Sequence, residues 1–190
     1  MKTIVGLFAR QLGLRLLKDI IDNKEYELKA VVTHYYEPDM ITPRKLFPHF
    51  VTMCEDYNIP LIIVGKNQEN LRILKELKFD YLIANCYKYI MPNEYLGMAK
   101  IGSYNMHRSL LPKHPGLKPL LKALKSGDEY VGTTMHELSE VVDGGKLIIQ
   151  EKVPIEKGDT EASLFKKIYP QQYRIMKKGL EIINENIHNS

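Results

Sequence analysis

Cysteine is scarce in this chain, which has only Cys54 and Cys86 among 190 residues. Two cysteines without metal-ligand spacing exclude a disulfide framework and a cysteine-based zinc site. Both stand among apolar residues, as is typical of reduced thiols in a core. We therefore expect a cytoplasmic protein.

Long apolar runs are also missing. The run that follows Lys2 is interrupted at Arg10, which makes it too short for a signal peptide, and no stretch reaches the length of a membrane span. The sequence therefore predicts no membrane partner.

A strong excess of one charge is absent as well. Lys and Arg number 27 against 23 Asp and Glu, which gives a net charge of +4. The basic residues are scattered and do not alternate with aromatic residues as in a nucleic-acid platform. This distribution favours a small anionic substrate and predicts no nucleic-acid partner.

Several motifs of common enzymes are missing. The segment Ala9-Arg10-Gln11-Leu12-Gly13 lacks the spaced glycines that NAD or ATP phosphates require. None of the six histidines has metal-ligand spacing to a cysteine or carboxylate, and there is no G-x-S-x-G sequence. We expect neither a metal nor a serine nucleophile.

The chain does contain an alternation of strand-like and helix-like segments. Short β-branched apolar runs occupy residues 3–8, 28–34, 60–64 and 80–84. Between them lie apolar stripes at helical spacing, one made of Leu12, Leu16, Leu17, Ile20 and Ile21 and another of Leu71, Ile73, Leu74 and Leu77. Such βαβ alternation predicts an α/β protein: a single Rossmann-like domain over residues 1–190, with a mostly parallel twisted sheet of about seven strands flanked by helices.

The second half of the chain continues this pattern. We expect strands over residues 101–107, 133–138 and 147–153, a helix over residues 119–125, and a final helix capped by Asp159-Thr160. The apolar side chains of this last helix suit either a core or a dimer contact, namely Tyr169, Tyr173, Ile175 and Met176. A homodimer therefore stays open.

The best candidate site is built from Asn105, His107 and Asp143. Alternation along a strand places Asn105 and His107 on one face. An amide, an imidazole and a carboxylate together suit acyl transfer to an amine. The alternatives are a hydrogen-bonded pair that closes a strand, and an Asp that forms a turn before Gly144-Gly145.

These residues belong to a longer series of motifs. Asn-x-His precedes Ser-Leu-Leu-Pro at 109–112, and Asp143 follows Asn105 by 38 positions. Other motifs in the series are Ala84 to Pro92, Pro115-Gly116, Ser126-Gly127-Asp128, Gly132-Thr133-Thr134 and Gly158-Asp159-Thr160. In this order they resemble the folate-dependent formyltransferases, which act on glycinamide ribonucleotide, methionyl-tRNA or nucleotide amino sugars.

The resemblance implies a site and a cosubstrate. Asn105, His107 and Asp143 take the catalytic positions, with 10-formyltetrahydrofolate as formyl donor and no metal. Asn105 and protonated His107 would stabilise an oxyanion, and Asp143 would hold the imidazolium. The folate would lie between two walls, formed by Tyr89, Ile90 and Met91 and by Leu138, Val141 and Val142; for Ile90 and Met91 the alternative is core packing.

The acceptor is less well defined by the sequence. We expect the primary amine of a small phosphorylated molecule, with Arg108 as a candidate anion clamp. A nucleotide-linked amino sugar is favoured because the segment Cys86 to Pro92 resembles the tRNA and amino-sugar branches. Glycinamide ribonucleotide is the alternative, although the Gly-x-Gly-Ser-Asn loop of that branch is missing; tRNA is disfavoured because the chain ends after its last helix. Hydrolysis of the formyl donor and a non-catalytic folate- or partner-binding domain rank lower.

Overall fold

The computed structural model describes residues 1–35 and 46–188. The chain forms two compact units, Met1–Tyr104 and Asn105–Ser190, which we describe in turn.

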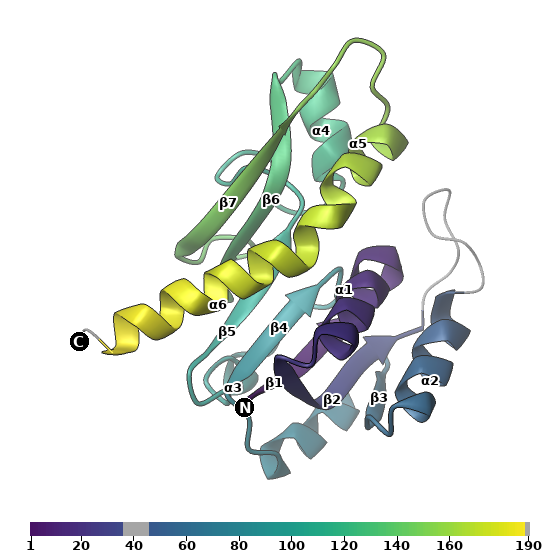
Figure 1. Ribbon diagram of the computed structural model, residues 1–190, viewed down its shortest axis with the longest axis vertical. Coiled ribbons are helices and arrows are strands. Elements are labelled where there is room, and N and C mark those ends of the chain that lie inside the picture. The colour runs from purple at the N-terminus through teal and green to yellow at the C-terminus, as the bar shows by residue number, and fades with distance from the viewer. Residues whose placement is uncertain (36–45, 189–190) are drawn as a thin grey trace. The chain divides into compact units, whose positions relative to one another are not determined.

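The first unit alternates strands and helices as the sequence predicts (Figure 1). Its elements in chain order are β1 (Lys2–Phe8), α1 (Arg10–Asn23), β2 (Tyr26–His34), α2 (Leu46–Asp56), β3 (Leu61–Val64), the 3-10 helix η1 (Glu69–Glu76), β4 (Tyr81–Asn85), α3 (Asn93–Leu96) and the start of β5 (Gly102–His107). Strand β1 pairs in parallel with β2 and β4, and β2 pairs in parallel with β3. The buried apolar runs of the sequence therefore form the expected parallel strands.

One predicted helix has a different geometry. The apolar stripe that begins at Leu71 forms the 3-10 helix η1 instead of an α-helix. Leu71 and Leu74 are buried, whereas Ile73 is 46% exposed. In a 3-10 helix, side chains three residues apart lie on the same face. Leu71 and Leu74 are therefore the two side chains of η1 that form its buried apolar face.

The second unit contains the rest of β5 and the remaining elements. These are α4 (Pro119–Ser126), β6 (Tyr130–Glu137), β7 (Leu147–Pro154), α5 (Glu161–Ile168), the 3-10 helix η2 (Tyr169–Gln171) and α6 (Gln172–His188). Strands β6 and β7 are antiparallel, and α6 packs along both (Figure 1). Thr160 caps α5 in a capping box with Ser163, as predicted from the sequence.

The predicted final helix is divided in two. The 3-10 helix η2, which contains Pro170, separates α5 from α6. Within α6, Ile175 and Met176 are completely buried in the unit's own core. Core packing is therefore confirmed for Ile175 and Met176, whereas Tyr169 and Tyr173 are half-buried and a dimer contact stays a prediction for them.

Two consecutive threonines of β6 connect different parts of this unit. The Thr133 hydroxyl lies 3.2 Å from Gln171 Oε1 and accepts a hydrogen bond from Gln172 Nε2. The Thr134 hydroxyl donates to the Ser109 carbonyl over 2.6 Å. Because neighbouring strand side chains point to opposite faces, β6 is tied to η2 and α6 on one side and to the loop after β5 on the other.

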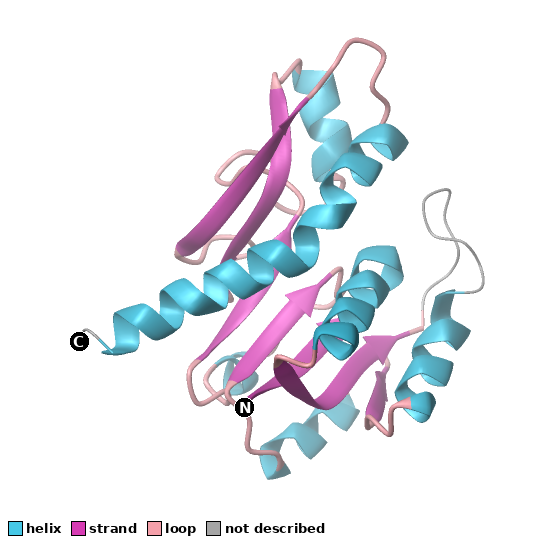
Figure 2. Ribbon diagram, in the orientation of Figure 1, coloured by secondary structure: helices cyan, strands magenta, loops and turns pink. Residues whose placement is uncertain are grey.

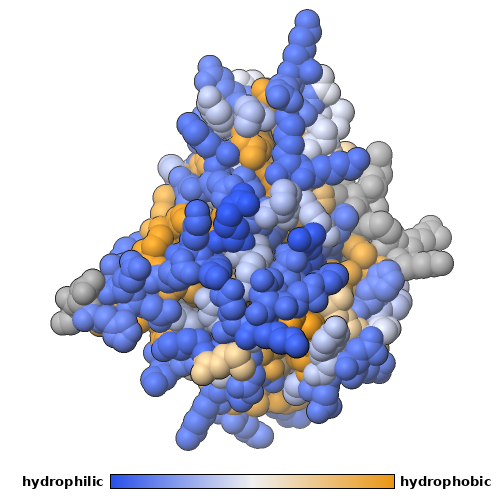
Figure 3. All heavy atoms as spheres, in the orientation of Figure 1, coloured by the Kyte–Doolittle hydropathy of each residue, from blue (hydrophilic) through white to orange (hydrophobic). Residues whose placement is uncertain are grey.

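The fold class predicted from the sequence is confirmed. Hydrogen bonding places the seven strands in the order β3-β2-β1-β4-β5-β6-β7, and helices flank the strands (Figure 2). The face seen in Figure 3 is mainly hydrophilic, with small groups of hydrophobic side chains between the polar ones. No helix among the described residues is long and apolar enough to cross a membrane.

Gly132 provides a test of the close approach between β6 and β7. A Cβ atom at this position would lie 2.1 Å from the Glu151 carbonyl oxygen, whereas one at Gly97 would have no atom within 4 Å. We expect Gly132→Ala to lower the free energy of unfolding by about 2 kcal/mol, because the β6–β7 pairing must move. Urea denaturation followed by circular dichroism would measure the change in the free energy of unfolding. An equal loss in the control Gly97→Ala would contradict this explanation.

Candidate active site

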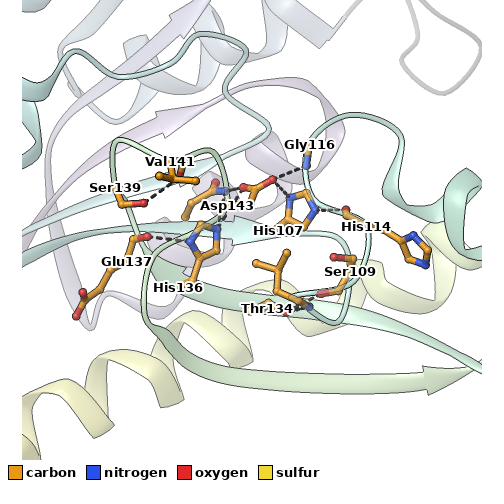
Figure 4. A network of polar contacts seen from close by, with 12 residues as sticks. His107, Ser109, His114, Gly116, Thr134, His136, Glu137, Ser139, Val141 and Asp143 are labelled. Atoms are coloured by element: carbon orange, nitrogen blue, oxygen red, sulfur yellow. Dashed lines mark hydrogen bonds and ion pairs between the residues drawn. The ribbon is translucent and has the colours of Figure 1, made fainter.

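The three residues predicted to be catalytic come together within the second unit, where Figure 4 shows His107 beside Asp143. His107 is the last residue of β5, and Asn105 lies two positions before it on the same strand. Asp143 comes from the turn between β6 and β7. Its carboxylate lies 3.2 Å from Asn105 Nδ2 and 3.2 Å from His107 Nδ1. The alternation along the strand and the position of the turn thus bring the amide, imidazole and carboxylate to one place.

The Asp143 turn directs its carboxylate inward. Asp143 has a φ of +54°, in the left-handed region, and Gly144 N–H donates to the Val141 carbonyl. A Cβ atom at Gly145 would lie 1.9 Å from the Glu137 carbonyl oxygen, so only glycine allows the turn to approach the end of β6 this closely. Asp143 is therefore both a turn former and a member of the cluster.

Asp143 remains charged although it is buried. Only 8% of its side chain is exposed. Burial opposes ionisation, but His136, His107 and the Gly116 N–H together outweigh it, so the pKa of Asp143 lies below its usual value. The Gly116 N–H donates to Oδ2 over 2.7 Å. A carboxylate with several donors is the expected stable form of a buried acid.

Each ring nitrogen of His107 faces a hydrogen-bond acceptor, whereas a neutral imidazole carries one N–H. Its Nε2 lies 3.0 Å from the His114 carbonyl oxygen and its Nδ1 lies 3.2 Å from Asp143 Oδ2. Both neighbours are acceptors, so only an imidazolium satisfies both contacts. Burial nevertheless lowers the pKa of His107 below its ordinary value, against the opposing effects of Asp143 and the His114 carbonyl. The resting ring is therefore neutral and surrounded by acceptors for a second proton.

His136 is a fourth member of the cluster that the sequence analysis gave no role. It lies on β6, is 1% exposed, and its Nε2 is 3.1 Å from Asn105 Nδ2. Its Nδ1 is 2.8 Å from the Glu137 carbonyl, so we assign the hydrogen to Nδ1 and the lone pair to Nε2. That tautomer satisfies these two contacts, and Nε2 also lies 3.4 Å from Asp143 Oδ1. His136 lies two positions after Thr134 on the predicted strand, so both side chains point to the same face. This alternation is the signal that could have identified His136.

The predicted folate-binding residues lie in both units. In the second unit, Val141 and Val142 are 69% and 51% exposed, and Leu138 is half-buried. In the first unit, Ile90 is 67% exposed, whereas Met91 is 5% exposed and packs into the core of that unit. Arg108, the predicted anion clamp, is half-buried and its charge contributes to lowering the pKa of His107.

A buried histidine holds the segment that carries Tyr89. His34, at the end of β2, accepts a hydrogen bond from the Lys88 N–H over 3.2 Å, and its ring makes edge contacts with Tyr87 and Tyr89. Burial lowers the pKa of His34. The Tyr87 hydroxyl donates to Gln68 Oε1 over 2.8 Å. The start of this segment is therefore ordered by contacts within its own unit.

Comparison with known proteins identifies the family. The family described as Formyl transferase matches residues 21–180. This match covers most of the chain, which therefore belongs to the formyl transferase family.

Relatives within this family differ in what they act on. The methionyl-tRNA formyltransferase of Lactobacillus gasseri is 31% identical over 173 residues, which cover 88% of this chain and 54% of that protein. The bifunctional polymyxin resistance protein ArnA of Wigglesworthia glossinidia brevipalpis is 32% identical over 164 residues, which cover 85% of this chain and 25% of that protein. The chain thus spans about half the length of the first relative and a quarter of the second.

Solved structures share the fold. The phosphoribosylglycinamide formyltransferase from Anaplasma phagocytophilum has a TM-score of 0.78 at 23% identity, over 98% of this chain and 88% of that one. WlaRD, a sugar 3N-formyl transferase solved in the presence of dTDP and 5-N-formyl-THF, has a TM-score of 0.70 at 21% identity, over 97% of this chain and 64% of that one. The described seven-stranded arrangement is therefore that of the formyltransferases.

The two buried histidines predict how stability depends on pH. His34 and His107 have pKa values below the ordinary 6.5 in the folded chain, so the unfolded chain binds more protons. The free energy of unfolding should therefore fall as the pH drops below about 6.5. Urea denaturation between pH 7 and pH 5 would measure the slope, which His34→Gln and His107→Gln should each reduce. The control His188→Gln, at the exposed end of α6, should keep the slope; equal slopes in all variants would contradict the assignment.

Proposed function

We propose that this chain transfers a formyl group from 10-formyltetrahydrofolate to the primary amine of a small phosphorylated acceptor. The observation that carries the proposal is the position of the buried His107 ring between two hydrogen-bond acceptors, the His114 carbonyl and the Asp143 carboxylate. A buried base that satisfies both of its acceptors only when protonated is suited to receive a proton from an attacking amine. Membership of the formyl transferase family supports the same chemistry.

The reaction requires two bond changes and two proton movements. The amine nitrogen forms a bond to the formyl carbon while the carbonyl electron pair moves to oxygen. Collapse of this oxyanion breaks the bond between the formyl carbon and N10 of the folate. One proton leaves the amine and one reaches N10, so a group that takes up and releases one proton completes the cycle.

His107 and Asp143 are proposed to move that proton. The Nδ1 edge of His107, shared with Asp143 Oδ2, takes the proton from the amine and becomes an imidazolium. The positive ring then stabilises the neighbouring oxyanion and releases the proton to N10. Asn105 donates its amide hydrogens to Asp143 Oδ1 and His136 Nε2, so it contacts an oxyanion only when one of these bonds is exchanged.

The proposed folate contacts are divided between side chains and backbone. Val141, Val142 and Ile90 present exposed apolar side chains that suit a flat heterocycle, and Leu138 and Tyr89 are partly exposed. Because the Met91 side chain is buried, we propose that this residue contributes through its backbone.

A nucleotide-linked amino sugar is our first candidate for the acceptor. The segment Cys86 to Pro92 resembles the tRNA and amino-sugar branches, and the loop at residues 9–13 lacks the glycines of the glycinamide ribonucleotide branch. Methionyl-tRNA formyltransferases among the relatives make tRNA an outcome that the experiment must include. Glycinamide ribonucleotide is retained as the alternative, since its formyltransferases share this fold.

An acceptor panel tests this proposal. Absorbance would report loss of the formyl group from 10-formyl-5,8-dideazafolate with nucleotide-linked 3-amino and 4-amino sugars, glycinamide ribonucleotide, methionyl-tRNA or no acceptor. We expect turnover with an amino sugar and a loss on the order of 100-fold in kcat for His107→Asn. The control His188→Asn should keep full turnover. Turnover with another acceptor would reassign the substrate, and activity without acceptor would indicate a hydrolase.

Arg108 gives a separate prediction about the acceptor. If its guanidinium binds an acceptor phosphate, Arg108→Ala should raise the KM for the acceptor on the order of tenfold, because a charge-assisted hydrogen bond is lost. The KM for the formyl donor should stay unchanged. Arg108→Lys keeps the charge and loses the planar fork, so an intermediate KM would indicate paired contacts. An unchanged acceptor KM in Arg108→Ala would remove Arg108 from the site.

A further inference from the structure

The loop between β5 and α4 serves the candidate site through its backbone. The His114 carbonyl oxygen lies 3.0 Å from His107 Nε2, and the Gly116 N–H donates to Asp143 Oδ2 over 2.7 Å. Both atoms belong to residues just after Pro112, outside any helix or strand. The orientation of His107 and Asp143 therefore depends on whatever fixes this stretch of backbone.

Asp128 is the side chain that holds the loop from outside the site. It follows α4, where its N–H donates to the Ala123 carbonyl. Its Oδ2 lies 2.8 Å from His114 Nε2, and its Oδ1 lies 3.2 Å from Lys113 Nζ. The side chains of Asp128 and His114 are 12% and 15% exposed, whereas Lys113 is 63% exposed. The shielded contact with His114 is therefore the stronger constraint, because exposed ion pairs contribute little.

The backbone of His114 shows why it needs such a constraint. Its φ is +55°, in the left-handed region that costs free energy for any residue with a Cβ. The contact with Asp128 fixes the His114 ring. Because the ring and the carbonyl belong to the same residue, a fixed ring limits the rotation of the His114 carbonyl. Lys113 is fixed in the same way: its ammonium contacts Asp128, and its carbonyl accepts from the Ser109 hydroxyl over 2.6 Å.

We propose that Asp128 is a positioning residue for formyl transfer, acting through the His114 ring to hold the His114 carbonyl against His107 Nε2. The inference rests on the role proposed above for His107. The Ser126-Gly127-Asp128 motif, which has no role in the sequence analysis, thereby gains one. Asp128 acts from the far side of the loop and touches neither His107 nor Asp143.

His107 itself provides a readout that does not require activity. Burial is the largest influence on the pKa of His107 and lowers it, Asp143 and the His114 carbonyl raise it, and His136 and Arg108 lower it. Loosening the loop should therefore shift the titration of His107 to lower pH. Histidine-ring 15N spectra recorded against pH would measure this shift in Asp128→Ala, with the His107 signal identified by its absence in His107→Asn.

A second variant tests the path of the effect. His114→Phe keeps an aromatic ring and the backbone carbonyl but cannot bond to Asp128. If the two residues act in series, Asp128→Ala and His114→Phe should shift the His107 titration alike, and the double variant should shift it no further.

Turnover provides the functional comparison. In Asp128→Ala, kcat should fall by about tenfold or more, because a displaced catalytic group loses its alignment, while the KM for the formyl donor stays within about twofold. The matched control is Asp159→Ala, which removes a carboxylate that accepts from Lys167 and Ser163 at the start of α5. This control should lose stability but keep the wild-type kcat per folded molecule and the wild-type titration of His107.

The possible results separate the two proposals. A shifted His107 titration in a chain with no detectable formyl transfer would support the role of Asp128 in positioning and refute the proposed function. An unshifted titration in Asp128→Ala, or loss of activity that merely parallels that of Asp159→Ala, would overturn the positioning role even if formyl transfer is established.

Discussion

The contact between His107 and Asp143 is the interaction around which the candidate site is arranged. Asp143 is charged although its side chain is buried, because an amide, a backbone N–H and two histidines surround its carboxylate. His107 is neutral there because burial opposes its charge. The pair therefore holds one negative charge and a site for one proton, which is the state an attacking amine requires.

The two histidines next to Asp143 differ although both are buried. His136 meets the Glu137 carbonyl at Nδ1, and its Nε2 lies between the Asn105 amide at 3.1 Å and Asp143 Oδ1 at 3.4 Å. His107 meets two acceptors, which a neutral ring cannot satisfy. Both edges of His107 therefore face acceptors alone, whereas the Nε2 edge of His136 also faces a donor. This difference in hydrogen-bond partners supports the proposed role of His107 as the proton carrier.

Local rules predicted most of the fold and part of the site. Short β-branched apolar runs identified the strands, and the alternation of side chains along a strand put Asn105 and His107 on one face. The apolar stripe at Leu71 was assigned to the wrong kind of helix, because spacings of three and four both occur in it. The complementary chemistry of an amide, an imidazole and a carboxylate joined Asp143 to the strand pair, and the family resemblance supported this, because a contact that spans 38 positions has no local spacing signal. The contact between His114 and Asp128 was missed for the same reason, because side-chain pairs across the fold leave no local pattern. His136 was missed although alternation along its strand could have identified it.

The turn between β6 and β7 has two sides with different properties. Its backbone is closed by the bond from Glu137 N–H to the Lys146 carbonyl and by the glycine that approaches β6. The Asp143 carboxylate points inward, whereas Val141 and Val142 are exposed. The side chains at positions 141 and 142 can therefore be exchanged for others of different shape without moving the Asp143 carboxylate. Under the proposed function, the turn uncouples ligand fit from proton chemistry, so an altered binding preference could be built here by exchanging two side chains on a fixed frame.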